Sequence, residues 1–273
     1  MTDDFGQQRF GPIVDVPWLL DHLGEPDLRV VDARPPGGYG LGHIPAALAL
    51  DLHAIQIQRS DADAVRAFQD RARQVLDDAG IGNGDRVVFY EEISGTLAAR
   101  GVWLLDYLGL GNGAMLDGGL QAWDAHGGPL TTAPADTRSA PSELAIDPRP
   151  DVLATADEIA TSLESDPSSV QLVDVRNDVE HLSGAIPGSI SLRWTNALGP
   201  DGALRPADDL RSLYTRVGLD PGRETITYCT GGFRSAHSYV VLKSLGFANV
   251  RNYAPSWTEW SARDDLPVAY PGR

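Results

Sequence analysis

The sequence contains very little cysteine: Cys229 is the single one among 273 residues. A single cysteine excludes an intramolecular disulfide, and the scattered histidines offer no cluster with the ligand spacing of a zinc site. We therefore expect no metal centre. Cys229 is then either an ordinary buried residue or a reactive thiol.

Long apolar runs and positive charge are also scarce. No segment approaches the roughly 18 consecutive apolar residues that a membrane-spanning helix needs. The acidic start of the chain, residues 1–6, lacks the pattern of a secretory signal, so we expect a cytoplasmic protein with no membrane partner. The formal net charge of −16 repels phosphate backbones, and we expect no nucleic-acid partner.

What the sequence does contain is an internal repeat. Short motifs recur in the same order in both halves: 30–34 (VVDAR) with 172–176 (LVDVR), 42–45 (GHIP) with 184–187 (GAIP), Tyr90 with Tyr228, 108–109 with 245–246, and Trp123 with Trp260. Their offset drifts only slightly, as short loop changes would produce. The stretch between the halves is rich in Pro, Ser, Thr and Ala, which is typical of a linker. We predict domains at 8–130 and 150–270, joined by a linker at 131–149.

Each half alternates strand-like and helix-like patterns. Short β-rich runs lie at 28–32, 87–90, 170–174 and 225–228. Helical patterns cover 64–79, 96–108 and 234–245, and a glycine follows each of them. Strands that alternate with helices predict an α/β fold in which each half has a mostly parallel sheet flanked by helices.

Cys229 follows directly on the predicted strand 225–228 and precedes a predicted helix. In an open α/β sheet, ligands bind in the crevice beyond the carboxyl ends of the strands, so Cys229 lies in a favoured place for a site. The loop continues as Thr230, Gly231, Gly232, Phe233, Arg234 and Ser235. Its two glycines allow successive N–H groups to turn inward as an anion-binding nest.

The same loop favours the thiolate form of Cys229. The helix that follows presents unsatisfied N–H groups and the positive end of its dipole, and Arg234 adds a permanent charge. Charge-assisted hydrogen bonds of this kind contribute roughly 1.5–3 kcal/mol each. We therefore expect Cys229 to titrate well below the ordinary value for free cysteine, about 8.5.

The first half provides an internal control. By the repeat, Glu91 occupies the position of Cys229. Because a carboxylate cannot act as a sulfur nucleophile, we expect the first half to be inert and to pack against the second.

Together these motifs resemble the rhodanese family. The resemblance rests on the Asp-x-Arg after an early strand, the Gly-x-Ile-Pro turn, the Cys-x-x-Gly-x-Arg-Ser loop and the closing segment 252–260, and it covers nearly the whole chain. The duplicated arrangement is similar to the two-domain sulfurtransferases that use thiosulfate or 3-mercaptopyruvate. It implies two tandem rhodanese-like domains, of which the second is catalytic.

The resemblance also implies a mechanism. The Cys229 thiolate would take a sulfur atom from a small anionic donor, become a persulfide, and pass the sulfur to cyanide, a thiol or a thioredoxin-like partner. Loop residues 230–235 would hold the sulfur, and no metal or organic cofactor would be needed. The absence of a second cysteine fits discharge to an external acceptor.

Two alternatives belong to other classes. Cysteine-dependent phosphatases place five residues between cysteine and arginine, whereas four separate Cys229 from Arg234, which makes a tighter cradle. A rhodanese-like scaffold without catalysis is the other alternative, and the intact cysteine and glycine loop argue against it.

The sulfur donor stays open between thiosulfate and 3-mercaptopyruvate. The loop matches neither type, and Glu180 stands where both tend to have a substrate-binding arginine. A carboxylate there would repel an anionic donor unless it points away. We favour thiosulfate because Arg234 and the amide nest suit a compact dianion.

Several further residues are expected near the loop. Trp194 is a candidate for substrate contact, with core packing as the alternative. Asp174 and Arg176 are expected to support the site through hydrogen bonds and an ion pair. His237, Trp257 and Trp260 are expected to be structural.

Overall fold

The computed structural model describes residues 10–35, 37–135 and 144–272. The chain divides into two compact units: unit 1 comprises Met1–Ile55, Gln69–Pro148 and Gly199–Leu204, and unit 2 comprises Gln56–Phe68, Arg149–Leu198 and Arg205–Arg273. The predicted domain ranges are continuous along the chain and do not anticipate the two short segments. Residues 1–6, the start of the first predicted domain and residues 136–143 of the predicted linker lie outside the described residues.

Unit 1 contains a parallel sheet. Its described strands follow the order β1-β5-β4-β2-β3 and are β1 (Ile13–Val14), β2 (Leu28–Asp32), β3 (Leu48–Ala49), β4 (Arg86–Tyr90) and β5 (Gly113–Leu116). The helices of this half are α1 (Val16–His22), α2 (Gly38–Leu41), the 3₁₀ turn η1 (Leu52–Ala54), α3 (Ala62–Asp78), α4 (Thr96–Tyr107) and α5 (Gly119–Ala125). Helix α3 crosses from unit 2 into unit 1 after Phe68.

Unit 2 repeats the arrangement. Its described strands follow the order β7-β6-β8-β9 and are β6 (Gln171–Asp174), β7 (Ile190–Ser191), β8 (Thr225–Tyr228) and β9 (Val250–Asn252), all parallel to their neighbours. Its other elements are α6 (Ala156–Ser165), α7 (Asp178–Ser183), η2 (Trp194–Ala197), α8 (Ala207–Arg216), α9 (Phe233–Ser244) and α10 (Ser256–Trp260). A parallel bridge from Leu153 to Asn252 takes the place that β1 has in unit 1.

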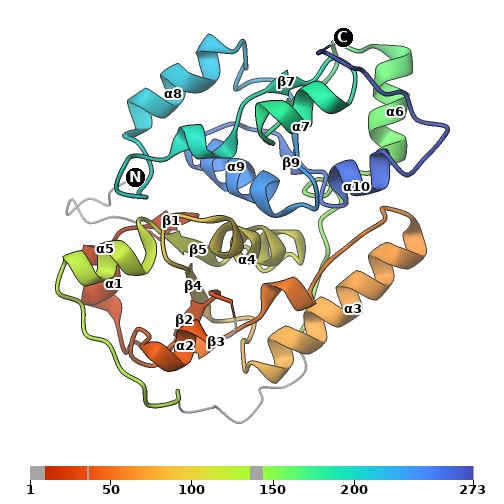
Figure 1. The fold of residues 1–273 in the computed structure, drawn as a ribbon. Helices are drawn as coiled ribbons and strands as arrows, with labels where there is room; N and C mark the ends of the chain where they lie inside the picture. Colours follow the sequence, from red (N-terminus) through yellow and green to blue (C-terminus); the bar gives the residue numbers. More distant parts are fainter. Residues whose placement is uncertain (1–9, 36, 136–143, 273) are drawn as a thin grey trace. The chain divides into compact units, whose positions relative to one another are not determined.

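These elements confirm the predicted α/β fold and the predicted order of strands and helices. Strands β4 and β8 are buried along almost their whole length because helices pack around each sheet (Figure 1). Trp123 and Trp260, which match in the repeat, are both fully buried in the cores of their own units. Among the described residues, no helix has the length and apolar character needed to pass through a bilayer.

A buried carboxylate fastens the short N-terminal segment of unit 2. Glu259 of α10 accepts hydrogen bonds from the Ser60 amide at 2.6 Å, the Ser60 hydroxyl at 2.8 Å and the Tyr253 hydroxyl at 2.9 Å. The Ser60 hydroxyl also accepts from the amide of Ala156, at the start of α6. One serine thus joins three parts of unit 2 that lie far apart in the sequence.

Replacing Ser60 with alanine is expected to destabilise unit 2. The substitution removes one donor from a buried carboxylate and the acceptor of the Ala156 amide, and each such loss costs about 1–3 kcal/mol. Urea unfolding of Ser60→Ala and of Ser165→Ala, an exposed serine on α6, measures the difference. Equal midpoints for the two variants would contradict the role assigned to Ser60.

Candidate active site

Cys229 lies at the carboxyl edge of the unit 2 sheet, directly after strand β8. All four residues of β8 are buried, and the strand pairs with β6 on one side and β9 on the other. The Thr227 hydroxyl donates to the carbonyl of Ser235 in α9 at 3.0 Å, which ties the strand to the helix behind the loop. The predicted position of Cys229 between a central strand and a helix is thus the one observed.

Hydrogen-bond donors converge on the Cys229 sulfur. The Gly232 amide donates to Sγ at 3.1 Å, and the hydroxyls of Ser235 and Ser256 lie 3.7 and 3.9 Å from it. The Cys229 amide itself donates to the Ser256 hydroxyl at 3.1 Å. Only 1% of the Cys229 surface is exposed, so these protein groups replace water around the sulfur.

These contacts lower the pKa of Cys229 despite its burial. Burial is the largest influence and raises the pKa, because it penalises the charged thiolate. The amide and hydroxyl of Ser235, the positive charge of Arg234 and the amide of Gly231 act in the opposite direction and together outweigh it. The direction of the shift agrees with the sequence prediction, and its main favourable source is hydrogen bonding.

Gly232 provides the turn from the loop into α9. It is the N-cap of α9 and has φ 86°, in the left-handed region that favours glycine. A Cβ atom at this position would lie 2.3 Å from the carbonyl oxygen of Ala254. Two independent constraints, backbone conformation and close approach, therefore require glycine where the amide meets the sulfur.

Arg234 does not extend freely toward the sulfur. Its guanidinium donates to both carboxylate oxygens of Glu180, each at 2.8 Å, and to the Thr230 hydroxyl at 2.6 Å. The Thr230 hydroxyl in turn donates to Glu180 at 3.0 Å. Glu180 therefore lies at the loop and its charge is matched by that of Arg234.

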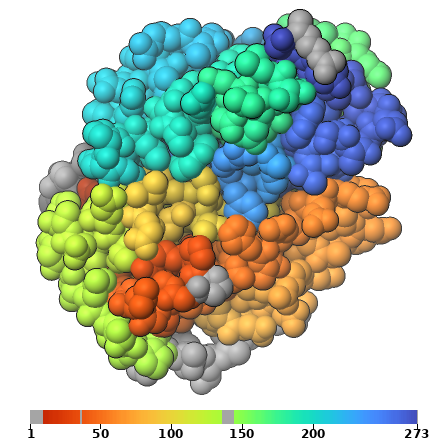
Figure 2. All heavy atoms as spheres, viewed as in Figure 1, coloured from red at the N-terminus to blue at the C-terminus, as the bar shows by residue number. Residues whose placement is uncertain are grey.

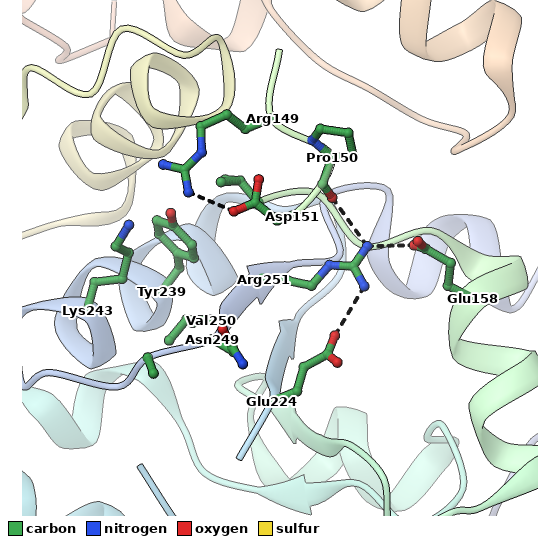
Figure 3. Close-up of a pocket in the computed structure, with 12 residues that line it drawn as sticks. Arg149, Pro150, Asp151, Glu158, Glu224, Tyr239, Lys243, Asn249, Val250 and Arg251 are labelled. Atoms are coloured by element: carbon green, nitrogen blue, oxygen red, sulfur yellow. Dashed lines mark hydrogen bonds and ion pairs between the residues drawn. The ribbon is translucent and has the colours of Figure 1, made fainter. Parts of the chain in front are cut away.

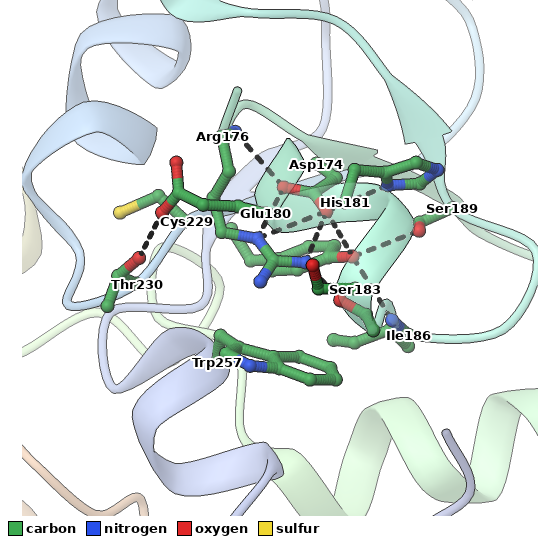
Figure 4. A network of polar contacts seen from close by, with 12 residues as sticks. Asp174, Arg176, Glu180, His181, Ser183, Ile186, Ser189, Cys229, Thr230 and Trp257 are labelled. Carbon is green, nitrogen blue, oxygen red and sulfur yellow. Dashed lines mark hydrogen bonds and ion pairs between the residues drawn. The ribbon is translucent and has the colours of Figure 1, made fainter. Parts of the chain in front are cut away.

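A buried ion pair supports the strand ends beneath the loop (Figure 4). Asp174 accepts from Arg176 at 2.6 Å, from the Tyr228 hydroxyl at 3.0 Å and from His181 at 2.9 Å. Arg176 also donates to the carbonyl of Gly184 at 2.7 Å, and its guanidinium lies 4.6 Å from the centre of the Trp257 ring. Since Tyr228 directly precedes Cys229, the pair fixes the start of the loop.

The remaining residues named from the sequence lie on η2, α9 and α10. Trp194, partly exposed at the start of η2, packs edge-on against His237 of α9 with ring centres 5.0 Å apart. Phe233 is the first residue of α9 and is half-buried. Trp260 belongs to the core of unit 2, as expected for a structural residue.

Sequence reasoning missed Ser256 and His181. Ser256 has φ 58°, rare for a residue with a side chain, and the repeat places it opposite Gly119, which has φ 57°. The exchange of glycine for serine at this position was a signal in the sequence, but it becomes meaningful only once the hydroxyl is seen beside Cys229. The role of His181 is likewise seen only in the folded chain, where its ring contacts the carboxylate of Asp174.

Glu91 occupies the corresponding position in unit 1. Its carboxylate accepts from the amides of Leu97 and Ala98, at the start of α4, at 2.5 and 3.1 Å. Burial raises the pKa of Glu91, and these two amides counteract the rise. The side chain is therefore an acceptor at a helix N-terminus, where unit 2 has a sulfur atom.

Other polar features of unit 2 lie elsewhere. A cavity of about 380 Å³ lies at the amino ends of β8 and β9, opposite the edge that carries Cys229. Figure 3 shows Arg251 in this cavity between Glu158 and Glu224, at 2.7 and 3.1 Å. In the part of the chain that the structure describes, no group of three or more His, Cys, Asp or Glu side chains could hold a metal ion.

Comparison with known proteins places the chain among sulfur-handling proteins. A family model described as "Rhodanese-like domain" matches residues 15–126 and 155–263. The thiosulfate sulfurtransferase of Azotobacter vinelandii is 30% identical over 275 residues, 97% of this chain and 99% of that protein. The thiosulfate sulfurtransferase of Pseudomonas aeruginosa is 31% identical and spans 92% of this chain and 94% of its own. The sulfur carrier protein TtuD of Thermus thermophilus is 31% identical, and the match spans 94% of this chain and 96% of TtuD.

Solved structures share the fold at lower identity. The anaerobic ergothioneine biosynthesis enzyme from Chlorobium limicola superposes with a TM-score of 0.83 at 22% identity, over 97% of this chain and 72% of its own. YnjE superposes with a TM-score of 0.81 at 22% identity, over 98% of this chain and 71% of its own.

The hydroxyl of Ser235 is expected to control the ionisation of Cys229. Because the hydroxyl favours the thiolate, Ser235→Ala raises the pKa of Cys229 and lowers its alkylation rate at pH 7 severalfold. The rate of iodoacetamide reaction measured from pH 5 to 10 shows the shift, with Ser244→Ala, an exposed serine of α9, as the matched control. Superimposable profiles for all three proteins would contradict this account of the thiolate.

Gly232 is expected to tolerate no side chain. Gly246 has a nearly identical φ of 88° but open space around its Cβ position, so Gly246→Ala measures the backbone cost alone, about 1–2 kcal/mol. Gly232→Ala adds the clash with the Ala254 carbonyl, for a total of about 2–5 kcal/mol. Urea unfolding of the two variants gives the comparison, and equal losses would refute the close-approach argument.

Proposed function

The chain belongs to the rhodanese family and is a sulfurtransferase, and from this premise we propose that it moves a sulfane sulfur from thiosulfate to a thiophilic acceptor through a persulfide on Cys229. The observation that carries the proposal is the convergence of amide and hydroxyl donors on a buried sulfur whose pKa is lowered. A thiolate of this kind is a ready nucleophile. The names of two full-length relatives support thiosulfate as the donor.

The reaction proceeds by two displacements at sulfur. The Cys229 thiolate attacks the outer sulfur of thiosulfate, a new S–S bond forms, and the old one breaks with its electron pair leaving on sulfite. The acceptor, which can be cyanide or a thiol, then attacks the outer sulfur of the persulfide. That sulfur leaves with the acceptor, and the electron pair of the broken bond restores the Cys229 thiolate, so neither step needs an external oxidant.

The loop residues take distinct parts in this proposal. The amides of Gly231, Gly232 and Ser235 stabilise the negative charge on the sulfur before and after transfer, since all three are placed at Cys229. Thr230, Phe233 and Trp194 border the loop and its helix, where donor and acceptor arrive.

The supporting residues hold the nucleophile in place. Asp174 and Arg176 fix the strand that ends in Tyr228, next to Cys229. Since the sequence has no second cysteine, the persulfide is discharged by an external acceptor, either a small thiol or a thioredoxin-like protein. Unit 1 carries Glu91 in place of the cysteine and takes no part in the sulfur chemistry.

Phosphoryl transfer fits this loop less well. A cysteine phosphatase needs an arginine that can fork onto the phosphate oxygens. Both terminal nitrogens of the Arg234 guanidinium already donate to the carboxylate of Glu180.

Intact-mass measurement tests the proposal directly. After incubation with thiosulfate, the protein is expected to gain one sulfur atom and to lose it on addition of cyanide, while Cys229→Ala gains none. A parallel incubation with 3-mercaptopyruvate ranks the two donors. A persulfide formed only with 3-mercaptopyruvate would replace the proposed donor, and none with either would refute the persulfide mechanism.

A further inference from the structure

Glu180 lies next to the sulfur-binding loop in a fixed position. It is the third residue of α7, where its amide donates to Asn177 at 2.9 Å and its carboxylate accepts from the Asn177 amide at 3.0 Å. This reciprocal capping box fixes the backbone and restricts the side chain. Helix α7 lies at the surface of unit 2 (Figure 2).

Hydrogen bonds occupy both oxygens of the Glu180 carboxylate. One oxygen accepts from Arg234 and from the Asn177 amide, and the other accepts from Arg234 and from the Thr230 hydroxyl. The two side chains are only partly exposed, 26% for Arg234 and 30% for Glu180. A two-pronged ion pair of this geometry keeps the guanidinium directed at the carboxylate.

The pair removes the net positive charge from the entrance of the loop. Arg234 is the cation that the loop itself carries, and Glu180 cancels it. The neighbouring carboxylate of α7, Asp178, is likewise paired with Arg193. The amide and hydroxyl dipoles around Cys229 attract an anion together with the part of the Arg234 field that the carboxylate does not offset, which still lowers the pKa of Cys229.

We infer that Glu180 is a specificity-determining residue that lowers the affinity of the Cys229 site for doubly charged anions more than for singly charged ones. The inference rests on the proposed use of this loop as the donor site. The carboxylate offsets the attraction that Arg234 would otherwise exert on an anion, and thiosulfate, a dianion, loses the most because the electrostatic free energy scales with ligand charge. Organic sulfane donors with one negative charge, such as thiosulfonates and persulfides of small thiols, lose half as much.

The charge state of Glu180 supports this donor class. The pairing with Arg234 lowers the pKa of Glu180 to about 2, so the carboxylate is ionised throughout the neutral range and offsets Arg234 there.

Protection of Cys229 from alkylation tests the inference without any sulfur transfer. Sulfate and methanesulfonate are similar in shape and differ by one charge, and their dissociation constants follow from the concentrations that slow iodoacetamide reaction at Cys229. Glu180→Gln removes the charge and retains a side chain suited to the capping box. Glu164→Gln, an exposed position on α6, makes the same charge change elsewhere in unit 2.

In Glu180→Gln, the dissociation constant is expected to fall about tenfold for sulfate and about threefold for methanesulfonate, since the electrostatic free energy scales with ligand charge. Glu164→Gln is expected to leave both constants unchanged. Equal changes for the two anions, or no change in Glu180→Gln, would overturn the inference. Because neither anion donates sulfur, this result is independent of whether thiosulfate converts Cys229 to a persulfide.

Discussion

A buried ion pair between a carboxylate and a guanidinium determines where the reactive loop begins. In unit 2, Asp174 joins Arg176 and the Tyr228 hydroxyl, and in unit 1 Asp32 joins Arg34 and the Tyr90 hydroxyl with nearly the same distances. Burying such a pair is tolerable only when its hydrogen-bonding groups are satisfied. The arginine meets this condition in each unit by donating to the carbonyl that follows α7 or α2, that of Gly184 or Gly42. The network belongs to the fold, since the half without a cysteine has it too.

What distinguishes the two halves is the residue that comes after the tyrosine. Both residues place a hydrogen-bond acceptor at the N-terminal amides of a helix. The acceptor is the sulfur of Cys229 at α9 and the carboxylate of Glu91 at α4. The fold thus favours negative charge at this point regardless of its chemistry. Glu91 satisfies the helix end with a carboxylate, whereas Cys229 places a sulfur atom at the corresponding donors of α9. The accompanying change from Gly119 to Ser256 adds a hydroxyl beside the sulfur.

The sequence was sufficient to predict the architecture and the position of Cys229 between a central strand and a helix. The repeat of Asp-x-Arg and the glycine after each helix carry local signals, and the strand before Cys229 is readable from its β-branched and aromatic residues. The pairs Glu180–Arg234 and Ser60–Glu259 were not predictable in this way, because 54 and 199 residues separate their members. Only the folded chain brings such residues together. The left-handed backbone of Ser256 was indicated only by its match to Gly119 in the repeat, since serine carries no local preference for it.

The pairing of Arg234 with Glu180 also bears on how one site can serve both halves of a transfer cycle. In the proposed persulfide mechanism, the loop has to stabilise a thiolate on Cys229 before sulfur arrives and a persulfide anion one atom further out afterwards. A free guanidinium would favour whichever anion lies nearer and would slow the step that removes it. Amide and hydroxyl dipoles from Gly232 and Ser235 stabilise negative charge with a shorter range and without a full countercharge. With Arg234 held by a carboxylate, the proposed cycle depends less on one fixed countercharge, which suits a sulfur atom that has to be both accepted and released.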